Sequence, residues 1–226
     1  MTPTHDPRER LSDSLSRNAN PALLQRLFRV LHRALFNNET DTRGAAALSL
    51  KHLCDATAIH LSQFLDPLMQ LYATALTSAV AAKQKNTAGV AASGSADTED
   101  GAMDPEDVLQ IIEGVGYVVS ALPVEQADPV LSAMLGPIAN SLFIMFPEEP
   151  ISAAPDTSVI VLHFDRLAAV MRYVAHPELV ASMFRDLWPI VARGLERCGD
   201  RDERSAEHIC RCIKYAFRTA RWDERN

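Results

Sequence analysis

Eight segments of this 226-residue chain carry apolar residues at three- and four-residue spacing, separated by short polar or proline-containing breaks. Such spacing places the apolar side chains on one face of an α-helix, because the helix turns once every 3.6 residues. Alternating runs of strand-forming residues are scarce, so we predict an all-α protein. The predicted helices span about residues 21–36, 45–61, 63–82, 105–122, 128–146, 158–175, 178–198 and 202–222.

These helices fall into four successive pairs, and a pair with its connector spans roughly 40 residues wherever no long loop interrupts it. That period predicts a right-handed α-solenoid of HEAT-type hairpins, an armadillo-type superhelix, with about four repeats. A single helical bundle is the alternative, and prolines inside helices, such as Pro137 and Pro189, favour the solenoid. The predicted organisation is a polar tail (1–20), a repeat segment (21–222) containing a flexible loop (83–104), and a short tail (223–226).

Charge and composition narrow the functional class. The chain has 22 Lys and Arg against 29 Asp and Glu, a net charge of −7, whereas general nucleic-acid binders are usually basic. The N-terminus lacks the apolar core of a signal peptide, and no uninterrupted run reaches the ~20 apolar residues of a membrane span. Four unevenly spaced cysteines do not suit a disulfide framework. We therefore expect a soluble, reduced, intracellular protein with no membrane partner and no direct nucleic-acid partner.

The charges are unevenly distributed along the chain. Residues 86–162 contain 12 acidic residues and no Lys or Arg, whereas the last 26 residues carry seven basic and five acidic ones. This pattern predicts two surfaces of opposite charge, the acidic one suited to basic peptide segments.

Basic residues on the last predicted helix recur every three or four positions and therefore share one face. They are Arg204, His208, Arg211, Lys214, Arg218, Arg221 and Arg225, and we call them the basic stripe. The expected apolar face comprises Ala206, Ile209, Cys210, Ile213, Ala216, Phe217 and Ala220. Guanidinium groups match phosphate oxygens, so the stripe predicts a surface for a polyanion or a phosphorylated peptide. The alternative is a solvated face neutralised by acids such as Glu203 and Glu207.

A set of cysteines and a histidine near the C-terminus favours a structural role. Cys198, His208, Cys210 and Cys212 resemble a zinc set, but Cys210 and Cys212 lie about 200° apart on a helix and cannot easily share a metal. We interpret Cys210 as a buried small residue. No metal site and no cofactor are expected.

Catalytic patterns are equally weak. Gly114 and Gly116 lack the strand and third glycine of a nucleotide fingerprint, and instead predict close helix packing. His163 and Asp165 fall on different helix faces, which does not suit a catalytic dyad. We expect Asp165 and Arg166 to make hydrogen bonds between helices, and the protein not to be an enzyme.

Four strings appear in order along the chain: SALP (Ser120–Pro123), FDRLAAVMR (Phe164–Arg172), DLWPIV (Asp186–Val191) and EHICRCIKYAFR (Glu207–Arg218). Together they resemble the central HEAT repeats of karyopherin-β (importin-β-like) nuclear transport receptors of the transportin-SR and importin-thirteen group. The resemblance runs from about residue 21 to 222. It implies that the second helix of each pair lines a concave, cargo-binding surface: 45–61, 105–122, 158–175 and 202–222.

The resemblance further implies that His208, Arg211, Lys214 and Arg218 match an arginine-rich helix that binds phosphorylated Arg-Ser-rich cargo such as splicing factors, with Arg204 and Arg221 extending it. His208 and Lys214 depart from the arginines expected there, which weakens the case for Arg-Ser specificity more than that for anion binding. Nuclear pore proteins are further possible partners, and the receptors shuttle between cytoplasm and nucleus.

Family members are several times longer than this chain. Their main site for the small GTPase Ran lies towards the N-terminus and is absent here, so we expect an internal segment, a partial gene model or a truncated paralogue. Other functions stay open on the sequence: a HEAT scaffold or adaptor without transport activity, a helical protein that binds RNA or polyphosphate, and a helical enzyme.

Overall fold

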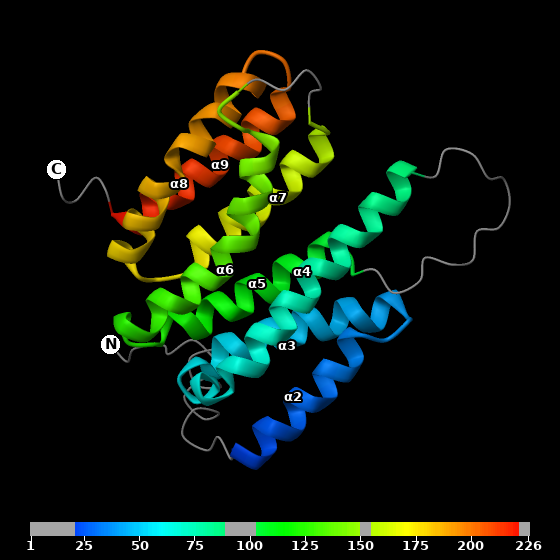
Figure 1. Ribbon diagram of the computed structural model, residues 1–226. Coiled ribbons are helices and arrows are strands. Elements are labelled where there is room, and N and C mark those ends of the chain that lie inside the picture. The colour runs from blue at the N-terminus through cyan, green and yellow to red at the C-terminus, as the bar shows by residue number, and fades with distance from the viewer. Residues whose placement is uncertain (1–20, 89–102, 150–154, 222–226) are drawn as a thin grey trace, which may run out of the picture. The chain divides into compact units, whose positions relative to one another are not determined.

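The computed structural model describes residues 21–88, 103–149 and 155–221, and these ranges contain helices and no strand (Figure 1). The α-helices are α2 (Pro21–Leu35), α3 (Thr40–Leu61), α4 (Leu65–Ala88), α5 (Pro105–Ser120), α6 (Val124–Met145), α7 (Thr157–Tyr173), α8 (Pro177–Cys198) and α9 (Glu203–Ala220). A 3-10 helix, η1 (Ser62–Phe64), joins α3 to α4. The predicted all-α class and all eight predicted helices are confirmed. The predicted tails, 1–20 and 223–226, lie outside the described residues.

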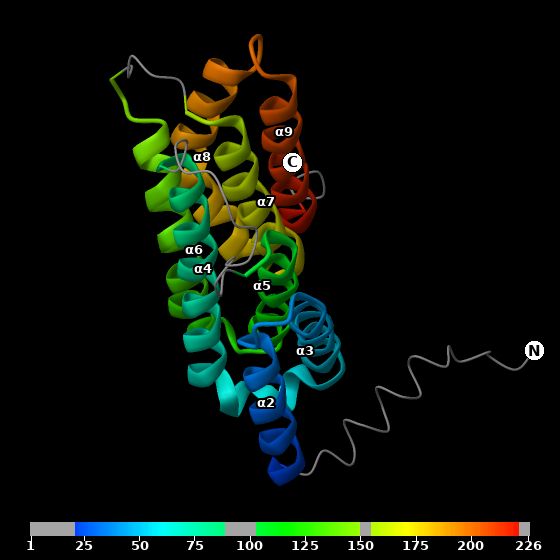
Figure 2. The ribbon, with the colours of Figure 1, turned by 90° about the vertical axis from the view of Figure 1, so that its right-hand side faces the viewer.

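The chain divides into two compact units, Met1–Ala121 and Leu122–Asn226. In unit 1, α2 packs on α3 and α4 on α5, and the second helices of these pairs, α3 and α5, pack together. Unit 2 repeats this scheme: α6 pairs with α7, α8 pairs with α9, and α7 packs along α9 (Figure 2). Each unit therefore has the packing of two successive HEAT-type hairpins in an α-solenoid.

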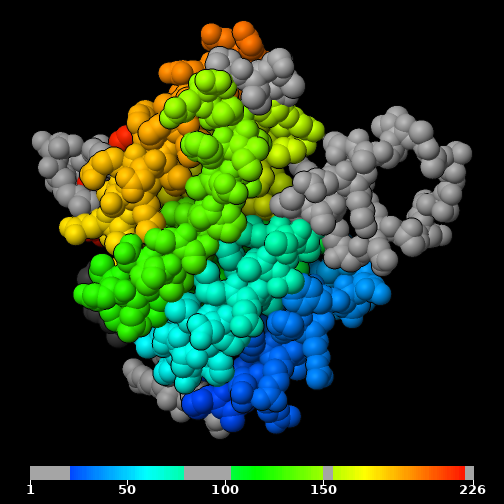
Figure 3. All heavy atoms as spheres, viewed as in Figure 1, coloured from blue at the N-terminus to red at the C-terminus, as the bar shows by residue number. Residues whose placement is uncertain are grey.

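Unit 2 has two helical layers. On the face drawn in Figure 3 its surface is made mainly by α6 and α8, and α9 is almost hidden. Within the other layer, contacts between α7 and α9 keep a nearly constant separation in sequence: Thr157 to Asp202 is 45 residues, whereas Asp165 to His208 and Arg172 to Tyr215 are both 43. The two helices therefore run parallel and in register, and the spacing agrees with the predicted repeat of about 40 residues.

Glycine allows α3 and α5 of unit 1 to approach closely. A Cβ added at buried Gly114 would lie 3.2 Å from the Cα of Lys51 and 3.4 Å from Cys54 Sγ. Beside it, Lys51 on α3 forms an ion pair with Glu113 on α5. The predicted helix-packing role of Gly114 is confirmed.

Several helix ends differ from the prediction. Helix α3 begins at Thr40 rather than near 45, and buried Arg43 in its first turn donates hydrogen bonds from Nη1 to the carbonyls of Asn37 (3.0 Å) and Asn38 (3.4 Å). These bonds fix the turn before α3, so polar residues that suggested a loop belong to the helix. Helix α6 begins at Val124 rather than near 128, and α4 continues to Ala88, into the predicted loop 83–104. Residues 89–102 of that loop lie outside the described part.

Helix α2 buries less of its apolar face than its periodicity predicts. Leu24, Phe28 and Leu35 are buried, but Leu23, Leu27 and Val30 are 53%, 40% and 63% exposed. The reason is that α2 packs mainly on one neighbour, α3, which covers only part of its circumference.

Helix α6 is, by length and composition, apolar enough to cross a membrane, which the sequence reading did not anticipate. In unit 2 it packs against α7 and α8 and buries Leu131, Met134, Ile138 and Leu142. Its apolar character therefore serves at least in part the core between the two helical layers.

Candidate functional site

Helix α9, which carries the basic stripe, is fixed at both ends. At its start, Asp202 Oδ1 accepts a hydrogen bond from the Ser205 amide (3.2 Å), and Oδ2 accepts from the Ser205 hydroxyl (2.5 Å). The Thr157 hydroxyl, at the start of α7, also donates to Asp202 Oδ2 (2.6 Å). At its end, Arg221 adopts a left-handed conformation (φ 49°) and its amide closes the last turn. The helix therefore ends at Ala220, two residues before the predicted end at 222.

The buried face of α9 differs from the predicted one. It consists of small residues and one isoleucine: Ser205, Ile209, Cys212, Ala216 and Ala220. At 100° per residue this face is rotated by about 60° from the predicted one. Small side chains allow α9 to lie close to α7 while it also packs on α8.

Because of this rotation, the cysteine that is buried is not the predicted one. Cys210 is exposed and Cys212 is buried, so the interpretation of Cys210 as a buried residue is wrong. Phe217 is 40% exposed and meets Phe184 of α8 edge to face, with ring centroids 6.2 Å apart. Among the described residues, no three His, Cys, Asp or Glu side chains gather as a metal site would require.

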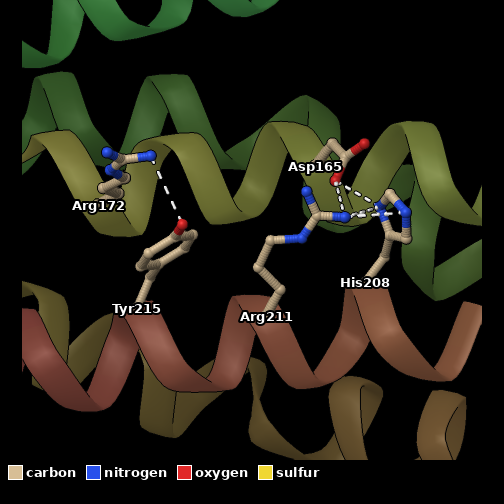
Figure 4. A network of polar contacts seen from close by, with 5 residues as sticks. All are labelled: Asp165, Arg172, His208, Arg211 and Tyr215. Carbon is tan, nitrogen blue, oxygen red and sulfur yellow. Dashed lines mark hydrogen bonds and ion pairs between the residues drawn. The ribbon is translucent and has the colours of Figure 1, made fainter.

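Asp165 of α7 reaches the N-terminal half of the basic stripe (Figure 4). Its Oδ1 lies 2.6 Å from His208 Nδ1 and 3.6 Å from Arg211 Nη2. Arg211 Nη2 in turn lies 2.9 Å from His208 Nε2. When the ring proton is on Nδ1, His208 donates to Asp165 and its Nε2 accepts from Arg211. The predicted inter-helix hydrogen bond of Asp165 is confirmed.

This contact divides the stripe into two parts. His208 and Arg211 both contact the carboxylate of Asp165, so this part of the stripe already has an acidic partner. Lys214, Arg218 and Arg221 are exposed and form no ion pair within the described ranges, and the same holds for Arg204. Glu203 and Glu207, the acids expected to neutralise the stripe, also form no ion pair with it within the described ranges. Arg225 lies outside the described residues.

A second α7 side chain, Arg172, lies beside the part of the stripe that Asp165 does not contact. Arg172 places its guanidinium carbon 5.0 Å from the ring centroid of Tyr173 and 5.2 Å from that of Tyr215. Its Nη1 also lies 3.5 Å from the Tyr215 hydroxyl (Figure 4). The sequence reading missed Arg172 and Tyr215. The 43-residue repeat was the signal that could have paired Asp165 with His208 and Arg172 with Tyr215.

If the basic stripe binds a phosphorylated peptide, as the sequence predicts, replacing Asp165 with asparagine should strengthen that binding by roughly two- to five-fold, because a partly exposed ion pair contributes up to about 1 kcal/mol. The substitution keeps the side-chain size but removes the charge that competes for His208 and Arg211. Fluorescence anisotropy with a labelled peptide would measure the change. Asp186→Asn, at an exposed site on α8, changes net charge equally. Equal gains in the two variants would show that only overall charge matters and would contradict the role of Asp165.

The chain is similar in sequence to a known transport protein. Over 206 residues, 90% of this chain, it is 30% identical to Transportin MOS14 of Arabidopsis thaliana. The chain spans 19% of the length of that relative. No protein-family model matches the chain. The comparison supports the resemblance to transportin-like karyopherins that the four sequence strings indicated.

Proposed function

We propose that this chain is a segment of a karyopherin-β nuclear transport receptor, of the transportin-SR and importin-thirteen group, that binds protein cargo and has no enzymatic role. The observation that carries the proposal is the alignment of 90% of the chain with a transportin. The all-α hairpin packing in each unit agrees with it, since such receptors are built from HEAT-type repeats.

The proposed cargo site is the basic stripe on α9, with Arg211, Lys214 and Arg218 as its centre and His208, Arg204 and Arg221 extending it. Three features of the helix support this assignment. Exposed guanidinium and ammonium groups follow one helix face, Lys214 and Arg218 form no ion pair in the described part of the chain, and α9 packs on both α7 and α8. A phosphorylated Arg-Ser-rich segment fits such a surface because its phosphates pair with the cations.

The remaining partners follow from the proposed family. The full-length receptor would bind Ran through repeats outside this segment, contact nuclear pore proteins and shuttle between cytoplasm and nucleus. The second helix of each pair, α9 included, would line the concave side of the superhelix.

The test is binding of a labelled Arg-Ser peptide, phosphorylated and unphosphorylated, at two salt concentrations. We expect preference for the phosphorylated peptide, and a loss of about ten-fold in the Arg211→Ala, Lys214→Ala, Arg218→Ala variant, from three solvent-exposed pairs of about 0.5 kcal/mol each. Raising the salt concentration should weaken binding of the wild type more than that of the variant.

The matched control removes three exposed cations from α2, as Arg26→Ala, Arg29→Ala, Arg33→Ala. It makes the same change in net charge but leaves α9 intact. If both triple variants lose the same affinity, or if the wild type does not distinguish phosphorylated from unphosphorylated peptide, the stripe is not the cargo site.

A further inference from the structure

The large apolar side chains that stay exposed gather in the first and last helical hairpins. Among the described residues eleven such side chains are exposed; eight belong to the α2–α3 and α8–α9 hairpins and the other three to α6. Leu23, Leu27 and Val30 lie on α2, whereas Trp188 (44% exposed) lies on α8 and Phe217 on α9. Exposed apolar groups that cluster in this way are typical of surfaces that bind another protein.

The exposed apolar residues of α2 lie on the side that points away from α4. Five other residues of α2 line a hollow together with Phe64 of η1 and Pro67 of α4, and they mark the side of α2 that faces these elements. At 100° per residue, Leu23, Leu27 and Val30 lie about 160° around the helix from that side. We call these three residues the α2 apolar face.

Trp188 lies on the side of α8 that points away from α6. Arg193 Nε donates to the carbonyl of Phe146 (2.9 Å) and Arg197 Nη2 to that of Pro147 (2.6 Å), just beyond the end of α6. These two arginines mark the side of α8 that faces α6, and Trp188 lies about 160° around the helix from them.

Helix α9 has the same arrangement. His208 and Tyr215 mark the side that faces α7, since they lie within hydrogen-bonding distance of Asp165 and Arg172 of that helix. Exposed Cys210 and Phe217 and half-buried Ile213 lie about 150 to 170° around the helix from them. We call Trp188, Cys210, Ile213 and Phe217 the α8–α9 apolar face; it lies opposite the side of this hairpin that receives α6 and α7.

Helix α3 presents small residues on its side away from α5. Gly44 and Lys51 mark the side that faces α5, through their proximity to Asp107 and Gly114. Ala45, Ser49, Leu53 and Ala56 lie about 145° around the helix from that side, and none of them is fully buried. The α2–α3 hairpin therefore has a free side that includes both of its helices.

We propose that the α8–α9 apolar face of one copy of the chain binds the α2–α3 hairpin of a second copy, through its α2 apolar face, so that copies associate head to tail. Within unit 2, successive hairpins pack first helix on first and second helix on second, as α6 on α8 and α7 on α9. The partner that continues this packing is a hairpin with a free apolar side on its first helix and small residues on its second. The α2–α3 hairpin has both features, so the chain supplies its own partner.

Charge favours this pairing over a contact between two copies of α2. Helix α2 carries three arginines and no acidic residue, so two copies of it would repel each other. Helix α8 exposes three acidic residues and one basic residue: Glu178, Asp186, Glu196 and Arg185. A head-to-tail contact leaves one free face at each end and therefore does not close. The inference does not depend on the proposed transport function.

The experiment is sedimentation velocity of the full 226-residue chain over a range of concentrations. A reducing buffer prevents disulfide formation through exposed Cys210. We expect reversible self-association that grows beyond a dimer as the concentration rises, because each copy keeps both faces. Val30→Glu and Trp188→Glu should each weaken it about ten-fold or more, because the contact would bury an unpaired charge.

Mixing the two variants gives the decisive result. Val30→Glu keeps an intact α8–α9 apolar face, and Trp188→Glu keeps an intact α2 apolar face. At a concentration where each variant alone is a monomer, we expect their equimolar mixture to form a one-to-one dimer that does not grow further. The two introduced glutamates have the same charge, so an attraction between them cannot cause the pairing.

Two further variants serve as controls. Ile144→Glu, at a 67% exposed position on α6, makes the same kind of change outside both faces and should associate like the wild type. Cys210→Glu disables the α8–α9 apolar face without removing the ring contact of Trp188 with Phe184, and it replaces Trp188→Glu if that variant does not fold. Far-UV circular dichroism establishes that each variant is folded.

Three results would overturn the proposal. A wild type that remains monomeric up to about 1 mM would show that the two faces do not bind each other. A mixture of the two variants that remains monomeric, or a dimer that only one of them disrupts, would indicate a contact between identical faces instead. Equal weakening by Ile144→Glu would show that the association depends on overall charge and not on these faces.

Discussion

Replacing Gly114 with valine is expected to lower the free energy of unfolding of unit 1 by about 3 kcal/mol. Gly114 is buried where α5 crosses α3, and even a Cβ would meet the Cα of Lys51 at 3.2 Å. That atom belongs to the backbone and cannot rotate away, so the two helices must move apart and lose contacts. The higher helix propensity of valine returns only a few tenths of a kcal/mol.

The measurement is urea unfolding followed by far-UV circular dichroism. Gly136→Val is the matched control, because Gly136 lies on the exposed side of α6 and nothing lies within 4 Å of an added Cβ. It should be nearly neutral. An unfolding midpoint for Gly114→Val equal to that of the wild type would show that α3 and α5 tolerate a wider separation than their packing indicates.

Replacing Asp202 with alanine is expected to destabilise unit 2 by about 2 kcal/mol at pH 7, the sum of a lost helix cap and a lost inter-helix hydrogen bond. One carboxylate receives the Ser205 amide and hydroxyl at the start of α9 and the Thr157 hydroxyl at the start of α7. Its removal therefore frees the starts of two packed helices. Asp200→Ala, at an exposed site just before, is the control and should change stability little.

The effect of Asp202 should also depend on pH. Hydrogen bonds from Ser205 and then Thr157 lower the pKa of the Asp202 carboxyl below its ordinary value. A lowered pKa in the folded state means that the stabilisation is complete above the ordinary pKa, about 4, and is lost as the pH falls through the lowered value. The difference between wild type and Asp202→Ala should therefore shrink below about pH 4. A constant difference from pH 7 to pH 3 would contradict this account.

Asp165 contacts His208 and Arg211 at the start of the basic stripe, whereas Arg218 and Arg221 near its end lie beside Arg172 and form no ion pair within the described ranges. Under the proposed function, we therefore expect the phosphates of a bound peptide to meet more unpaired positive charge near the end of α9 than near its start.

The sequence alone determined the helices and their order. Apolar spacing, together with polar and proline-containing breaks, located every helix in the described ranges with its ends within six residues, because these signals act locally. The repeat of about 40 residues also predicted which helices pair. Where ends were missed, as at Thr40, the cause was a tertiary contact: Arg43 binds the carbonyls of the preceding turn.

Only the tertiary structure decided which side of α9 is buried and which charges are already paired. Periodicity placed Cys210 on the apolar face, whereas α9 buries Cys212 together with the small residues Ala216 and Ala220 where it packs on α7 and α8. The same approach brought Asp165 to the stripe from 43 residues away. Spacing along one helix gives the angles between its own side chains. Which residue of a neighbouring helix each side chain contacts depends on how the two helices pack, and the packing depends on the whole unit.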